Sequence, residues 1–157
     1  MKIKLIAVGK TDNPYLEQCI TPYIKRLAHY TSFEWIGLPD IKNSKSLSRE
    51  QQKQKEGELL QKYLGANDYL ILLDEKGSTY SSEGFAEFIQ KKQIQGIKNL
   101  CFVIGGPYGF SDEMYQLSNG LLSLSSMTFS HQMVRLFFVE QLYRAFTILK
   151  NEPYHHR

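Results

Sequence analysis

Hydrophobic and polar positions along this chain follow two periods, one typical of strands and one typical of helices. Five short segments are apolar or alternate with period two, which predicts strands over residues 2–9, 32–39, 68–74, 99–106 and 120–127. Between them, apolar residues recur every three or four positions, which predicts helices. Strands that alternate with helices in this way indicate an α/β fold: a mainly parallel sheet with helices on both faces.

Capping residues predict where these helices begin and end. An Asp-Asn pair before Pro14 supplies the start of the first helix. Ser48 and Gln51 have the spacing of a capping box, and Gly65 is expected to close that second helix. A further helix is expected after Ser82, and Ser111 is expected to cap a short one that begins with two acidic residues.

The last helix, expected over about 131–150, is apolar around most of its circumference. Its sequence is "HQMVRLFFVEQLYRAFTILK", and one face of a sheet cannot bury all of these side chains. We therefore expect a second face that packs on a partner subunit, which favours a homodimer. Glu140 and Arg144 have the four-residue spacing of an ion pair on this helix.

Length and composition are those of an ordinary globular protein. The 157 residues are expected to form one domain over 1–157, and 22% charged with 42% hydrophobic residues argues against a disordered chain. A net charge of +3 leaves RNA binding undecided.

The two cysteines, Cys19 and Cys101, lie in apolar patterns and are expected in the core. No signal peptide or run of about 18 apolar residues occurs, so we expect a cytoplasmic protein that does not bind membranes.

Three strand ends carry distinctive turns, and in a parallel sheet such ends collect ligands. They are Leu73-Asp74, Gly105-Gly106 and the stretch from Ser125 to Phe129, and we expect them to form one pocket. Other chemistries lack their motifs. There is no GxxxxGK[ST] loop, no GxGxxG after the first strand and no GxSxG elbow, and the histidines lack the HExxH spacing of a metal site. No metal is expected.

Several sequence blocks together resemble one family. They are "KIKLIAVGK", "EGELL", "LDEKGSTYSSEGFA", "VIGGPYG", "LSLSSMTFSHQMVRLFFVEQLYRAF" and "EPYHHR", which cover essentially the whole chain. In this order and spacing they resemble the RlmH family of SPOUT-class methyltransferases. The resemblance implies a C-terminal trefoil knot, one of the rare exceptions to unknotted topology. It also implies S-adenosyl-L-methionine as cofactor, bound in the knot by Leu73, Gly105, Leu124, Ser125, Ser126, Met127, Thr128 and Phe129.

The resemblance also implies the reaction and the partners. The family methylates N3 of a pseudouridine in 23S ribosomal RNA, presented by the assembled ribosome, so the expected partner is ribosomal RNA and not DNA. Two alternatives stay open. The first is a SPOUT methyltransferase that acts on tRNA, and the second is a knotted RNA-binding protein without catalysis.

Four residues are candidates for catalysis under this resemblance. His131 or the tail histidines are expected to take or relay the N3 proton, although His131 could equally bond a local carbonyl. Arg135 is expected to stabilise the developing imide charge or bind phosphate, since a charge on an apolar helix is costly unless it is directed into a site. In the tail, Tyr154 and His155 are expected to complete the site or touch RNA, while the roles of His156 and Arg157 stay open. Ser130 stands where the family pattern has proline, and it can cap the helix instead.

Overall fold

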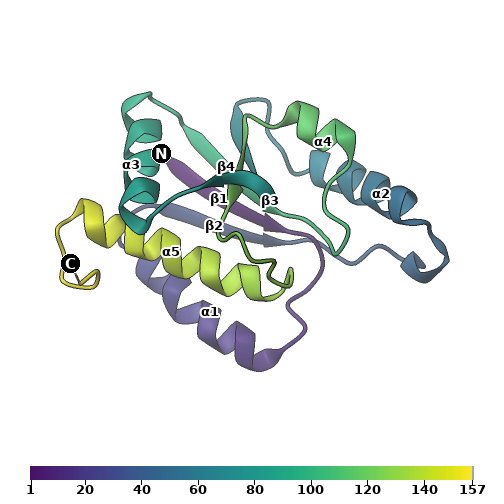
Figure 1. Cartoon of the computed structure of the whole chain (residues 1–157), viewed down its shortest axis with the longest axis horizontal. Helices are drawn as coiled ribbons and strands as arrows, with labels where there is room; N and C mark the ends of the chain where they lie inside the picture. Colours follow the sequence, from purple (N-terminus) through teal and green to yellow (C-terminus); the bar gives the residue numbers. More distant parts are fainter. Residues whose placement is uncertain (157) are drawn as a thin grey trace.

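The computed structural model, which describes residues 1–156, contains one five-stranded sheet with helices on both faces (Figure 1). The strand order is β2-β1-β4-β3-β5, and every neighbouring pair is parallel. The strands are β1 (Lys2–Ala7), β2 (Ser32–Gly37), β3 (Asp68–Thr79), β4 (Asn99–Ile104) and β5 (Gly120–Ser123). The predicted α/β class with a parallel sheet is confirmed.

Within residues 1–156, four α-helices and one short 3-10 helix connect these strands, and a fifth α-helix follows β5. They are α1 (Pro14–Leu27), η1 (Ser44–Ser46), α2 (Arg49–Gln61), α3 (Ser82–Ile94), α4 (Asp112–Leu117) and α5 (Met133–Leu149). One core cluster joins α1, α3 and α5 to one sheet face, and a second joins α2 and α4 to the other. Because β4 is covered on both sides, Phe102 belongs to the first cluster and Val103 to the second.

The helix starts agree with the capping prediction, and one helix end does not. Ser48 and Gln51 form a complete capping box at the start of α2. This helix ends at Gln61 rather than at Gly65, so the prediction of a glycine cap is wrong. Gly65 lies instead in the turn into β3, where its N–H donates to Asp68 Oδ2 at 2.9 Å.

The end of β3 carries a feature that the sequence did not predict. Leu122 of β5 pairs with Leu73 and also with Ser78, so the residues between these two positions form a bulge against β5. We call residues 74–79 the strap. Figure 1 shows the chain there arching across the sheet toward α3. The strap passes so close that a Cβ on Gly77 would lie 2.5 Å from the backbone nitrogen of Leu122.

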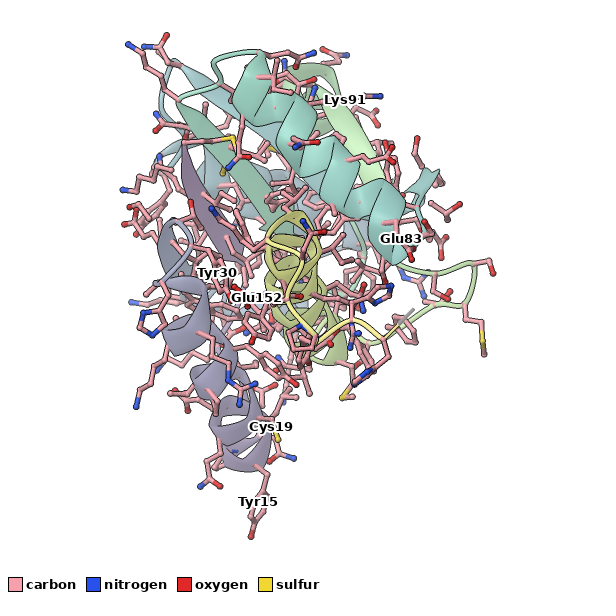
Figure 2. All side chains as sticks on the ribbon, turned by 90° about the vertical axis from the view of Figure 1, so that its left-hand side faces the viewer. Tyr15, Cys19, Tyr30, Glu83, Lys91 and Glu152 are labelled. Carbon is pink, nitrogen blue, oxygen red and sulfur yellow. The ribbon has the colours of Figure 1, made fainter. Side chains whose placement is uncertain are left out.

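The two cysteines differ in environment. Cys101 is fully buried in β4, and burial raises the pKa of its thiol to about 12. Cys19 is exposed, so its expected place in the core is wrong (Figure 2). The reason is that α1 buries a narrow stripe that includes Leu16 and Ile20, and position 19 lies at the edge of that stripe. Among the described residues, no helix has both the length and the apolar character needed to cross a bilayer.

Candidate active site

The carboxyl ends of β3, β4 and β5 converge on one cavity of about 780 Å³. This volume is within the range of small-molecule sites. The structure therefore brings together the three turns that the sequence singled out. Seven of the expected cofactor-binding residues line the cavity: Leu73, Gly105, Leu124, Ser125, Met127, Thr128 and Phe129. Ser126 lies in the same loop but does not line it.

The glycine turn after β4 presents backbone to the cavity. Gly109 donates its N–H to the carbonyl of Gly106 at 3.2 Å and has a φ of +80°, which only glycine adopts without strain. A Cβ on Gly105 would lie 3.1 Å from the ring of Phe110. The turn is therefore tightly packed on its inner side, and its residues 105–109 line the cavity.

The loop after β5 is shaped by its own serines. Ser123 Oγ donates to the carbonyl of Ser125 at 2.7 Å, and Ser125 Oγ accepts the N–H of Met127 at 2.9 Å. Thr128 Oγ1 donates to Glu75 Oε2 at 3.0 Å, which ties this loop to the strap. These contacts hold the third wall of the cavity in place before any ligand is bound.

A carboxylate also lines the cavity. Asp74 accepts a hydrogen bond from Tyr115 Oη at 2.6 Å and another from the backbone N–H of Lys76 at 2.9 Å. Burial, and then the bond to Asp74, raise the pKa of Tyr115. The sequence drew attention to Asp74 only as a strand end, and no sequence signal pointed to Tyr115, since the two residues are brought together by the fold.

His131 lines the cavity and is half-buried. Burial, followed by the positive charge of Arg135, lowers the pKa of this histidine. The imidazole is therefore neutral at pH 7 and able to accept a proton. The N-cap of α5 is Gln132, so the prediction that Ser130 caps this helix is wrong. Ser130 lies two residues earlier, where its Oγ accepts the N–H of Met133 at 3.2 Å.

The structure places Arg135 outside the cavity, under the loop that follows β1. Its side chain is fully buried and donates to the carbonyl of Val8 at 2.8 Å, the carbonyl of Gly9 at 3.1 Å and Thr11 Oγ1 at 3.0 Å. The geometry thus gives no contact between Arg135 and a ligand of the cavity. What it shows is a side chain that fixes the loop after β1 beside His131.

Comparison with known proteins identifies the family. The model of a family described as "Predicted SPOUT methyltransferase" matches residues 1–155. The chain belongs to the SPOUT methyltransferase family. Among curated proteins, it is similar to the ribosomal RNA large subunit methyltransferase H of Flavobacterium johnsoniae, 63% identical over 157 residues and 100% of both chains. Proteins of the same name from Parabacteroides distasonis and Porphyromonas gingivalis are 56% and 53% identical, each over 156 residues and 99% of both chains.

As a SPOUT methyltransferase, the chain has the knotted α/β fold and uses S-adenosyl-L-methionine. The strap agrees with such a knot, because it pairs with β5 and also contacts the loop that follows β5, where Thr128 Oγ1 donates to Glu75 Oε2. The cavity suits this cofactor. Adenine is a flat ring with polar edges, and Leu73 and Leu124 offer apolar walls beside the open backbone of the glycine turn.

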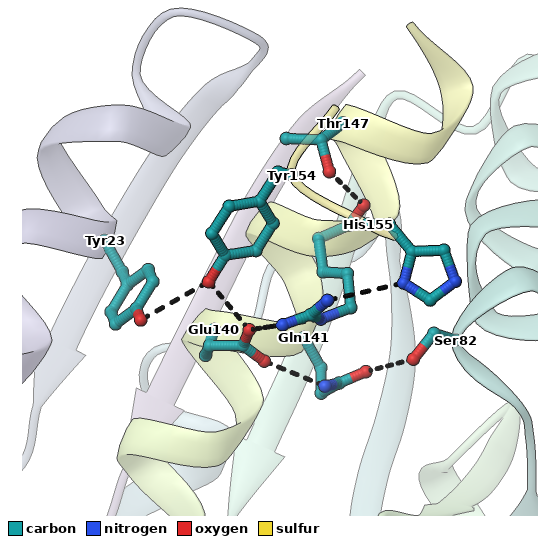
Figure 3. A network of polar contacts seen from close by, with 8 residues as sticks. Tyr23, Ser82, Glu140, Gln141, Thr147, Tyr154 and His155 are labelled. Atoms are coloured by element: carbon teal, nitrogen blue, oxygen red, sulfur yellow. Dashed lines mark hydrogen bonds and ion pairs between the residues drawn. The ribbon is translucent and has the colours of Figure 1, made fainter. Parts of the chain in front are cut away.

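In this SPOUT methyltransferase, the tail after α5 folds back on its own helix. Figure 3 shows Tyr154 Oη donating to Glu140 Oε1 at 2.9 Å, with Tyr23 Oη 3.4 Å away. His155 Nε2 lies 2.9 Å from Glu83 Oε1. Neither Tyr154 nor His155 lines the cavity of its own chain, because α5 begins near the cavity and its 17 residues carry the tail roughly 25 Å away.

Further contacts fasten this end of the chain. Glu152 accepts a hydrogen bond from the hydroxyl of Tyr30, and both lie on the face shown in Figure 2. The ion pair predicted between Glu140 and Arg144 is confirmed, with Arg144 Nε 3.1 Å from Glu140 Oε1. The tail is therefore docked on α5 rather than frayed. Arg157 lies outside the described residues.

Proposed function

We propose that this chain methylates N3 of a pseudouridine in the 23S RNA of the large ribosomal subunit, within assembled ribosomes. The observation that carries the proposal is the convergence of three strand ends on one cavity. The substrate class is supported by relatives named ribosomal RNA large subunit methyltransferase H, which match the whole chain at 53–63% identity. In this proposal, Leu73, Gly105 and Leu124 hold the adenine of the cofactor, and the loop from Ser125 to Phe129 holds the remainder.

The chain's own residues have two tasks in this reaction. S-adenosyl-L-methionine supplies a methyl group on a sulfonium, ready for in-line displacement, so the protein must align the acceptor and remove the N3 proton. We assign proton removal to His131, since it lines the cavity and its lowered pKa keeps it neutral. Arg135 acts indirectly here, by holding the adjacent loop and by lowering the pKa of His131.

Basic side chains at the rim of the cavity favour RNA as the acceptor. Arg49, Lys53 and Lys76 line the cavity, where they can contact phosphate groups. The guanidinium of Arg49 lies 5.4 Å from the ring centroid of Tyr108, an exposed aromatic on the glycine turn. Exposed aromatic rings and arginine planes are the surfaces on which unpaired bases stack.

We also propose that two copies of the chain pair through α1 and α5. A groove of about 660 Å³ lies between these helices. Its rim exposes Phe137, whose ring centroid is 4.9 Å from that of Phe129. Such pairing would carry the tail of one protomer toward the cavity of its partner, which gives Tyr154 and His155 their place in catalysis.

Phe137→Glu should yield monomers in light scattering, whereas Ile94→Glu, a matched change at an exposed position of α3, should not. A wild type that stays monomeric at micromolar concentration would refute the pairing.

The decisive experiment supplies the enzyme with labelled S-adenosyl-L-methionine and ribosomes that lack the modification. The expected result is label on one pseudouridine of 23S RNA, with no label on free tRNA. Transfer of the label to tRNA alone would show that tRNA, and not 23S RNA, is the substrate. Absence of transfer to any RNA would overturn the catalytic proposal. His131→Asn serves as the site variant, with His29→Asn as its control in the exposed turn after α1.

A further inference from the structure

A buried glutamate stands directly behind the glycine turn. Glu56, from the "EGELL" block, lies on α2 and is only 4% exposed. A Cβ on Gly106 would lie 2.5 Å from both of its carboxylate oxygens, so carboxylate and turn are in direct contact. The next residue, Gly57, is equally close to the segment after the turn, since a Cβ there would lie 2.7 Å from Ser111 Oγ. Helix α2 thus supports the whole segment that lines one side of the cavity.

One oxygen of this carboxylate has no partner. Gln52 Nε2 donates to Glu56 Oε1 at 2.8 Å, whereas Glu56 Oε2 is buried without a hydrogen bond. Leaving a buried carboxylate oxygen unpaired costs free energy of folding. The backbone of Gly106, in the turn that lines the cavity, lies against this carboxylate. A small movement of that turn would therefore complete the bond.

We propose that Glu56 is a positioning residue whose free Oε2 accepts the backbone N–H of Gly106 when the glycine turn closes on S-adenosyl-L-methionine. This inference rests on the proposed function only in placing the cofactor in this cavity. A bond that reaches hydrogen-bond geometry in the bound state adds to cofactor affinity. The free protein retains the unpaired oxygen at a cost in stability, as is common at functional sites.

The charges around Glu56 agree with this account. Burial raises the pKa of Glu56, the bond from Gln52 lowers it, and the negative charge of Asp40 raises it. The backbone N–H of Gly106 also lowers it, so this amide is already close to the carboxylate although it does not have hydrogen-bond geometry. Because the folded protein disfavours the charged form, a neutral side chain of the same shape should fold at least as stably at neutral pH. Stability and cofactor affinity are thus expected to change in opposite directions, which a purely structural role would not produce.

The test uses Glu56→Gln, with Glu58→Gln as the control that removes the same charge from the exposed face of α2. Because Gln52 already donates to Oε1, the new amide nitrogen takes the place of Oε2 and cannot accept. Calorimetry should show affinity for S-adenosyl-L-methionine roughly tenfold weaker in Glu56→Gln, the factor expected for one charge-assisted hydrogen bond, and unchanged in Glu58→Gln. The melting temperature of Glu56→Gln should equal or exceed that of the wild type. Glu56→Leu, which has no acceptor, should bind as weakly.

Hydrogen exchange at the Gly106 amide tests the bond itself. Addition of cofactor should slow this exchange in the wild type and in Glu58→Gln, and much less in the two Glu56 variants. Wild-type affinity in either Glu56 variant would overturn the inference, and so would a lowered melting temperature in Glu56→Gln together with unchanged exchange at Gly106. A wild type that binds no S-adenosyl-L-methionine would instead refute the proposed function.

Discussion

Replacing Gly77 by alanine tests the contact between the strap and β5. The added Cβ would lie 2.5 Å from Leu122 N and 2.6 Å from the carbonyl carbons of Leu121 and Leu122. Ordinary carbon contacts need about 3.5 Å, so the strap must lift by roughly 1 Å. All three neighbours are backbone atoms of a paired strand and cannot rotate away as a side chain would.

The expected cost follows from two effects. Overpacking of this kind costs about 1–3 kcal/mol. Lifting the strap also weakens the pairing of Ser78 with Leu122 and of Thr79 with Ser123, and each lost hydrogen bond costs about 0.5–1.5 kcal/mol. Together they predict a loss of about 2–4 kcal/mol. For a chain of this length that lowers the melting temperature by roughly 5–15 °C.

Thermal unfolding followed by circular dichroism measures this loss. Gly37→Ala is the matched control, since it is also a strand glycine and its new Cβ would lie 3.7 Å from Trp35 Nε1, an ordinary contact. The control should change stability by less than about 0.5 kcal/mol. A Gly77→Ala protein that melts within about 2 °C of the wild type, or a control that loses as much, would refute the reasoning.

The remaining predictions concern the last helix and the tail. Arg135→Met should lose about 3 kcal/mol in urea unfolding, because three backbone carbonyls and a hydroxyl lose their donor; a loss below about 1 kcal/mol would contradict that role. Ser130→Ala should lose about 0.5–1.5 kcal/mol, because the N–H of Met133 loses its side-chain acceptor, and an unchanged melting temperature would contradict a role for this bond in stability. Methyl transfer should lose activity on the acid side only below pH 6.5, because His131 has a lowered pKa and is protonated only below that pH. A loss of activity that begins above pH 6.5 would exclude His131 as the base. The bond to His155 lowers the pKa of Glu83, so tail docking should be intact above pH 4.5 and weaken as pH falls through that lowered value; Glu83→Gln should speed hydrogen exchange in the tail already at pH 7.

Local signals in the sequence predicted the elements and the place of the cavity. The capping box at Ser48 and the periodicity of each segment are decided by neighbouring residues, so the sequence alone reveals them. The three turns could be grouped because parallel strands bring their carboxyl ends to one edge of the sheet. Leu73 and Gly105 were found for that reason.

Contacts between distant segments could not be predicted in the same way. The strap extends β3 to Thr79 although residues 75–79 carry no apolar side chain. These residues are in the strand because they pair with β5, and this pairing has no signal in the local sequence. Arg135 is the other instance. A charge on an apolar helix suggests a site, and only the structure shows that backbone carbonyls 126 and 127 positions earlier receive it. For Cys19, the apolar pattern predicted the helix α1 correctly. It did not show that the buried stripe of this helix is too narrow to include position 19.

The enclosure of β5 by the strap has a consequence for biosynthesis. The cavity takes walls both from the enclosing residues and from those that emerge beneath them. A growing polypeptide whose residues after β4 have not yet left the ribosome therefore lacks part of the cavity wall, however well its first four strands have assembled. Under the proposed function, retention of the methyl donor marks a molecule that has been fully released and threaded.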